Sequence, residues 1–197
     1  MKKVYYLLAV LFIFSLGIST AMAQQSSGHQ TLTKKEIRKA KREAQKKFME
    51  AQDQVLFEQG LQALKEQSFV IEVDQLIYPR GMVQYVSPLT NFVYINKGKA
   101  VVQIAVNNFA PGPNGVGGVT VEGTPSDITM STDKKGNVYY NFTAQGIAIS
   151  ATVNIQMTPG SNRATVTIYP NFNNRDLTMT GKIVPYDQSR IFQGQTI

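Results

Sequence analysis

The sequence predicts a mainly β protein, an antiparallel β-meander that closes as a barrel or as a two-sheet sandwich, preceded by a long N-terminal amphipathic helix. The first observation is periodicity: apolar residues recur at spacings of three and four up to about residue 67 and at every second position after Ser68. The second is that short runs of Gly, Pro, Asn and Asp join the period-two segments, with no helical pattern between them. Pattern alone does not choose between barrel and sandwich, because both protect the sheet edges.

We expect five segments along the chain: a signal peptide (1–23), a mobile tail (24–32), an amphipathic basic helix (33–67), an antiparallel β domain (68–185) and a C-terminal tail (186–197). The order Lys2-Lys3, a short apolar run and Ala21-Met22-Ala23 is that of a secretory leader with its cleavage site. The run is shorter than the roughly 20 apolar residues of a membrane span. We therefore expect a periplasmic or extracellular mature chain that begins at Gln24 and has no membrane span.

The absence of cysteine narrows the class of exported protein. Without cysteine there is no disulfide framework, although an oxidising compartment would permit one. There is also no cysteine at the leader junction to carry a lipid, which excludes a classical bacterial lipoprotein.

The helix is predicted from its cap and its stripe. Thr33-Lys34-Lys35-Glu36 has the form of a capping box, in which Thr33 and Glu36 satisfy each other's backbone amides. Apolar residues then recur at spacings of three and four and so lie along one side of the helix, namely Ile37, Ala40, Ala44, Phe48, Ala51 and Val55. This stripe is extended by Phe57, Leu61 and Leu64. Gly60 is expected to weaken the helix, or to mark a break or kink.

The positive charge belongs to this helix rather than to the β domain. Between Lys34 and Lys47 there are eight Lys or Arg residues, against Glu36 and Glu43 alone. Such a run is usually a solvated face; the alternative is weak contact with anionic envelope material or lipid headgroups, which basic amphipathic helices bind. Nucleic acid is disfavoured, because the run lacks interleaved stacking aromatics and the chain carries an export signal.

Alternation predicts one buried and one wet face for the strands. The clearest strand is 148–158, whose inward residues would be Ile149, Ala151, Val153, Ile155 and Met157. Similar inward sets are Val138, Tyr140 and Phe142, then Ala164, Val166 and Ile168. One face of another predicted strand is formed by Val102, Ile104 and Val106. Residues 119–122 and 128–131 are predicted as two separate, weaker strands.

The residue inventory excludes much catalytic chemistry. His29 is the only histidine and lies in the predicted tail, so Ser-His-Asp and Cys-His catalysis and zinc sites built on Cys or His are excluded. The carboxylates of interest are interpreted as solvent-facing strand and turn residues; they are Glu72, Asp74, Glu122, Asp127 and Asp133. The glycine-rich loop 111–118 lacks the Lys-Ser/Thr of a phosphate loop and is predicted to join two strands.

The strand-rich part resembles a known family. The runs Asn114–Gly123 and Lys135–Phe142, with the later strand Ala164–Pro170 and Leu177–Ile183, are similar to the DUF4251 family of uncharacterised exported Bacteroidetes proteins. The resemblance covers roughly residues 46–185 and rests on turn glycines and strand alternation. It implies a bacterial envelope setting and carries over no catalytic residue.

These observations favour a non-enzymatic binding or interaction module of the cell envelope. It would engage an envelope protein or glycan through the polar Ser/Thr/Asn strand face or the glycine-rich loop. The alternative is a carrier of a small hydrophobic ligand, with a barrel lumen lined by inward residues, namely Phe142, Ile149, Val153, Ile155 and Val166. A hydrolase using carboxylates alone is a third, weaker alternative. No catalytic residue, metal ligand or cofactor is assigned, and the binding residues stay unassigned.

Overall fold

The structure of the protein is a computed structural model that describes residues 33–106, 112–146, 150–171 and 176–196. The predicted leader, the predicted tail and His29 therefore lie outside the described residues. The chain divides into two units, residues 1–40 and residues 41–197, and the strands of the described residues all belong to the second.

The predicted helix is present as α2 (Lys34–Lys65). Its capping box is confirmed: the backbone N–H of Thr33 donates to Glu36 Oε2 at 2.8 Å, and the N–H of Glu36 donates to Thr33 Oγ1 at 3.3 Å. The first of these bonds lowers the pKa of Glu36 below its usual range. The helices of the described part are not long and apolar enough to cross a membrane.

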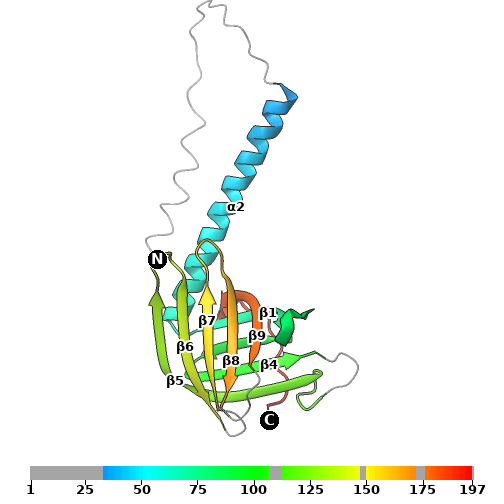
Figure 1. Ribbon diagram of the computed structural model, residues 1–197, viewed down its shortest axis with the longest axis vertical. Helices are drawn as coiled ribbons and strands as arrows, with labels where there is room; N and C mark the ends of the chain where they lie inside the picture. The colour runs from blue at the N-terminus through cyan, green and yellow to red at the C-terminus, as the bar shows by residue number, and fades with distance from the viewer. Residues whose placement is uncertain (1–32, 107–111, 147–149, 172–175, 197) are drawn as a thin grey trace, which may run out of the picture. The chain divides into compact units, whose positions relative to one another are not determined.

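The expectation of a break at Gly60 is wrong, because α2 runs through it. A Cβ built on Gly60 would lie 3.4 Å from Met157 Sδ and 3.5 Å from Ile183 Cβ. These are ordinary van der Waals distances, so the last turns of α2 pack directly on the strands that carry Met157 and Ile183. Ala63 and Leu64 beside Gly60 are buried in the main core. Figure 1 shows these last turns of α2 lying against one end of the β-structure.

The sheet closes on itself, so the fold is a barrel and not a two-sheet sandwich. Eight antiparallel strands form the ring, and they are β1 (Phe69–Ile77), β3 (Phe92–Asn96), β4 (Lys99–Ala105), β5 (Gly118–Thr132), β6 (Val138–Gln145), β7 (Ser150–Met157), β8 (Arg163–Pro170) and β9 (Leu177–Pro185). Closure occurs at β1, where Val70 lies opposite Tyr94 of β3 on one edge and Val184 of β9 on the other. The short β2 (Val83–Tyr85) extends the β3 edge of β1.

The two strands predicted at 119–122 and 128–131 are one long strand, β5. Its first part pairs with β4 up to Gly123, and its second part pairs with β6 from Thr124 onward. The pairing with β6 shifts register between Ser126 and Thr129, and Asp127 there has a φ of +52°. This irregularity explains why the alternation along the sequence is interrupted in the middle of a single strand.

The barrel interior is filled with side chains. The predicted inward faces of β6, β7 and β8 are confirmed, and they join residues of β1, β3, β9 and α2 in one buried cluster that includes Leu64, Phe69, Tyr140, Phe142, Val153, Ile155, Val166 and Ile183. Ile149 lies outside the described residues. Because the residues proposed to line a lumen pack against one another, the interior favours a solid core over a ligand cavity.

A second buried cluster lies on the outer side of the barrel, over β1, β3 and β4. Here the outward residues Val70, Phe92, Tyr94 and Val101 are at most 3% exposed. They are covered from the C-terminal side by Val184, Tyr186 and Ile191. The predicted face of Val102, Ile104 and Val106 is only partly buried, and Val106 lies beyond β4 and is 39% exposed. The residues on the other face of β4, Val101, Gln103 and Ala105, are buried.

The segment Arg190–Thr196, which we call the C-terminal strap, has no regular secondary structure but is fixed to this outer face. The side-chain amide of Gln103 donates to the carbonyls of Thr90 (3.0 Å) and Phe192 (2.8 Å). Its oxygen accepts from Thr120 Oγ1 (2.7 Å) and from the N–H of Gly194 (2.8 Å). One fully buried glutamine on β4 thus ties together the turn before β3, the strand β5 and the strap.

Candidate functional site on the outer face of the barrel

The outward side chains of β6 to β9 form an uncovered polar surface. Strand register places Asn141, Asn154, Thr167 and Thr178 in one row across the four strands. Tyr139, Gln156, Thr165 and Thr180 form the next row. We call this surface the polar face, and its members are Tyr139, Asn141, Thr143, Thr152, Asn154, Gln156, Thr165, Thr167, Tyr169, Thr178 and Thr180.

Much of the hydrogen-bonding capacity of the polar face is unused. Asn154, Gln156 and Thr165 are exposed, and within the described part of the chain their side chains make no hydrogen bond. Amide and hydroxyl groups can both donate and accept, and here they stand on rigid strands whose opposite faces are locked in the core. Such an array can bind a ligand that itself carries many hydroxyl or amide groups.

A groove of about 450 Å³ lies where β7 ends and β8 begins. We call it the amide groove, and its lining residues are Gln75, Gln156, Thr158, Arg163, Ala164, Thr165 and Thr180. The guanidinium of Arg163 is fixed by two hydrogen bonds to the carboxylate of Asp74, at 2.8 and 2.9 Å. Thr180 donates to Gln75 Oε1 at 3.0 Å, which orients the glutamine amide. The groove is thus pre-ordered for a polar ligand.

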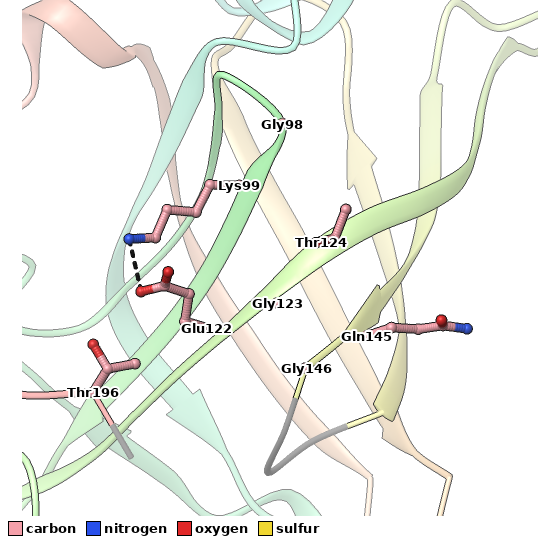
Figure 2. A pocket seen from close by; sticks show the side chains of 8 residues that line it. All are labelled: Gly98, Lys99, Glu122, Gly123, Thr124, Gln145, Gly146 and Thr196. Carbon is pink, nitrogen blue, oxygen red and sulfur yellow. Dashed lines mark ion pairs between the residues drawn. The ribbon is translucent and has the colours of Figure 1, made fainter.

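A second groove, of about 850 Å³, opens where β5 changes partner from β4 to β6. We call it the ion-pair groove; it is lined by Gly98, Lys99, Glu122, Gly123, Thr124, Gln145, Gly146 and Thr196. Figure 2 shows Lys99 and Glu122 pointing toward each other, and their charged atoms lie 2.7 Å apart. Both side chains are partly exposed, so this pair contributes little to stability but gives the groove one donor and one acceptor of opposite charge.

Glycine is required at the floor of the ion-pair groove. A Cβ on Gly123 would lie 2.8 Å from the carbonyl oxygen of Gln145, and one on Gly146 would collide with the carbonyl oxygen of Glu122. Side chains at these two positions would push β5 and β6 apart. The glycines therefore let the strands approach and leave backbone rather than side chains at the bottom of the groove.

The carboxylates considered as catalytic candidates have separate structural partners. Glu72 accepts from Ser189 Oγ at 3.0 Å, and Asp74 holds Arg163 as described above. In the described chain, no group of three or more His, Cys, Asp or Glu side chains is placed to hold a metal ion.

Asp133 caps the turn between β5 and β6. Its carboxylate accepts from the backbone N–H groups of Lys135 (2.8 Å) and Asn137 (2.9 Å) and from the side-chain amide of Asn137 (2.7 Å). The side-chain bond from Asn137 contributes most, followed by the backbone bonds; together they stabilise the ionised form and lower the pKa of Asp133. Asp127 accepts from the neighbouring Ser126 at the irregular point of β5. Asp133 therefore has a local role in the turn between β5 and β6, and Asp127 has one within β5.

The glycine-rich loop has a structural role in the part that is described, residues 112–118. Asn114 is buried, and its side-chain oxygen accepts from the N–H groups of Val116 (3.1 Å) and Gly118 (2.9 Å). Its amide donates to Thr120 Oγ1 at 3.1 Å. The loop is thus pinned to the polar network beneath the C-terminal strap, and it lines neither of the two grooves.

The fold and these surfaces define a class: a small antiparallel barrel with a solid core and an outer face equipped for polar contacts. The sequence profile described as "Domain of unknown function (DUF4251)" matches residues 51–183, and the chain belongs to this family. The resemblance noted from the sequence is therefore confirmed.

A solved structure supports the same family assignment. The chain is similar to the crystal structure, at 1.95 Å resolution, of a DUF4251 family protein from Bacteroides eggerthii DSM 20697. The two share 48% sequence identity with a TM-score of 0.64, over 75% of this chain and 99% of that chain. A comparison with curated proteins gives no match.

Sequence reasoning found the polar strand face but not the grooves. Asp74 and Arg163 are 89 positions apart, and nothing in their local sequence predicts that they meet. The signal that was available is the pair of glycines at 123 and 146, because isolated glycine within a strand pattern indicates close backbone approach.

Proposed function

We propose that this protein is a non-enzymatic binding module of the bacterial cell envelope that holds a glycan chain on its polar face. The observation that carries the proposal is the set of registered rows of amide and hydroxyl groups on β6 to β9, with unused hydrogen-bonding capacity. A sugar chain presents hydroxyl groups that can pair with such rows, and the rings of Tyr139 and Tyr169 offer flat apolar surfaces for sugar rings.

The positions of the two grooves support an extended ligand. The ion-pair groove includes Gln145, which lies opposite Ser150 at the start of β7, and the amide groove includes Gln156 near its end. The eight residues of β7 span roughly 25 Å. A chain lying along β7 would therefore contact both grooves and the rows between them.

A glycan fits this face better than a folded protein. Protein interfaces generally contain a dry apolar centre rich in aromatic residues and Met. The polar face offers instead threonine, asparagine and glutamine, with Tyr139 and Tyr169 as its only aromatic members. The solid interior, for its part, gives no support to the alternative of a hydrophobic-ligand carrier.

The test is binding of the purified protein to polysaccharide fractions from the envelope of its own cells, measured by titration calorimetry. The double variant Asn154→Ala/Gln156→Ala removes two exposed amides, and we expect at least about tenfold weaker binding, since each lost hydrogen bond is worth about 1 kcal/mol. Gln52→Ala/Gln59→Ala, which removes two exposed amides from α2, is the matched control. Absence of binding to every fraction, or equal loss in both variants, would contradict the proposal.

We also infer export, from the leader-like residues 1–23. The intact mass of the protein recovered from the periplasmic fraction or the medium should then begin at Gln24. A chain that keeps residues 1–23 and remains in the cytosolic fraction would overturn this part of the proposal without affecting the glycan-binding measurement.

A further inference from the structure

Helix α2 leaves a stretch of its surface uncovered. Every residue from Lys41 to Gln52 is exposed, whereas Gly60, Ala63 and Leu64 further along the helix are buried against the barrel. Residues 34–40, considered by themselves, are exposed throughout as well. This uncovered stretch is not needed for the barrel core, so its residue pattern requires another explanation.

The uncovered stretch carries an apolar stripe. Ala44, Phe48, Ala51 and Val55 follow at intervals of four, three and four, which places them within a sector of roughly 60° around the helix. Phe48 is 67% exposed and Val55 is 53% exposed. A solvent-exposed phenylalanine in the centre of a helical stripe is a feature that a purely solvated helix does not need.

Cations flank this stripe. Helical geometry places Lys41 on one side of it and Lys47 on the other, whereas Arg42 and Lys46 lie on the opposite side of the helix. The ion pair between Lys46 and Glu50, at 3.6 Å, is exposed and does not neutralise the flanking charges. Residues 34–40 add four more cations in the sequence.

We propose that residues 41–55 of α2 bind the surface of an anionic lipid bilayer. Phe48 and Val55 would enter the boundary between headgroups and acyl chains, and the long side chains of Lys41 and Lys47 would reach the phosphates on either side. Charge complementarity identifies the occupant, because a cation on each side of a thin apolar stripe matches a planar anionic surface. The site is separate from the polar face and goes beyond glycan binding.

A second copy of the helix fits the stripe less well. Helix pairs need large apolar knobs at most seam positions, whereas two of the four stripe residues are the alanines Ala44 and Ala51. The flanking Lys41 and Lys47 would also bring like charges together across such a seam. Pairing of α2 with the α2 of a second copy is therefore the less favoured alternative, and the experiments below can detect it.

The first experiment is sedimentation of the protein, as isolated from its cells, with vesicles of equal parts phosphatidylglycerol and phosphatidylcholine at low salt. We expect binding to these vesicles, none to pure phosphatidylcholine, and loss on adding salt. The variant Lys41→Gln/Arg42→Gln/Lys46→Gln/Lys47→Gln should bind at least about twentyfold more weakly, since Lys41 and Lys47 flank the stripe and each cation near an anionic surface contributes about fivefold.

The matched control removes the same charge from the barrel, as Lys97→Gln/Lys134→Gln/Lys135→Gln/Lys182→Gln, at four exposed lysines. This variant should bind vesicles within about threefold of the unaltered protein, because its α2 is intact. Absence of binding by the unaltered protein, equal weakening of both variants, or binding to phosphatidylcholine alone would each overturn the proposal.

A second measurement reports on the stripe itself. The chain contains no cysteine, so a single polarity-sensitive dye can be attached at Ala44→Cys on the stripe or at Gln45→Cys beside it. Anionic vesicles should shift the emission of the dye to the blue at position 44 and much less at position 45. A blue shift that occurs without lipid, together with a dimer by light scattering, would show that the stripe pairs with a second copy and would overturn the lipid proposal.

Discussion

Two regions of the barrel use the same alternating strand in different ways. On β6, β7 and β8 one face is buried and the other is wet, as in Val153, Asn154 and Ile155. On β3 four consecutive residues, from Phe92 to Ile95, are buried. The first region is covered on one side only, whereas the second is covered by the core inside and by the C-terminal side of the chain outside.

The difference shows that burial of a strand is not a property of the strand alone. The outer cover of β1, β3 and β4 comes from Tyr186, Ile191 and the backbone of the C-terminal strap. These residues have no periodicity, and they contact the sheet through a few hydrogen bonds and apolar side chains. The uncovered region is then the one left available for partners.

The largest expected effect tests whether the two outer faces differ as described. Phe92→Ala removes an outward but fully buried ring, and we expect a loss of about 3–5 kcal/mol in the free energy of unfolding. Gln156→Ala, outward on β7, should change it by less than about 0.5 kcal/mol. Urea unfolding followed by circular dichroism measures both, and similar small losses would show that the strap does not exclude water from β3.

Gln103→Leu tests the hydrogen bonds that hold the cover in place. The substitution leaves the Phe192 carbonyl and the Gly194 N–H without their partner, and we expect a loss of about 3 kcal/mol in the free energy of unfolding. Gln145→Leu, at an exposed position of the ion-pair groove, is the matched control and should cost less than about 1 kcal/mol. Equal losses would assign the effect of Gln103 to strand preference rather than to the network.

Gly194→Ala tests the strap by itself. A Cβ at this position would collide with the carbonyl oxygen of Asn114, so the strap must move away from the barrel. We expect trypsin to cleave after the exposed Arg190 about tenfold faster, which corresponds to about 1.4 kcal/mol of local destabilisation. The control Gln195→Ala keeps the backbone hydrogen bond to Asn114 and should leave the cleavage rate unchanged. Faster cleavage of this control would show that the strap is held by exposed side chains.

The smallest effect concerns the inner face shared by both regions. The hydroxyl of Tyr140 is buried and has no hydrogen-bond partner in the described chain, so Tyr140→Phe should stabilise the protein by about 1 kcal/mol. Burial also raises the pKa of Tyr140 to about 12 from an ordinary value of 10.0. Because the unfolded chain ionises first, this residue costs stability as pH rises from about 10 to about 12, and Tyr140→Phe should reduce that loss. Thermal unfolding at pH 7 and from pH 10 to pH 12 measures both effects. An unchanged or lower stability of Tyr140→Phe at pH 7 would indicate a partner for the hydroxyl.

Features that depend on contacts between residues close in the sequence could be predicted, whereas features that depend on distant contacts could not. Thr33 and Glu36 are three positions apart and the inward residues of β7 alternate regularly, so local pattern was enough for the helix cap and the core strands. The burial of Val101 and Gln103 depends on a strap nearly ninety positions later, and Gln103 meets Phe192 at a separation of 89. The grooves likewise depend on strand register and on the merging of two predicted strands into β5.

The closure of the ring at β1 has a consequence for how the protein is made. Thr180 of β9 bonds to Gln75 of β1 across 105 positions, and β1 is the first strand to be synthesised. Until β9 exists, β1 has an open edge and the ring cannot form, so folding must wait for nearly the whole chain and should be slow, as for other structures dominated by distant contacts. While the chain is being made it therefore lacks the closed ring, and a chain without that ring can still be threaded through a narrow channel.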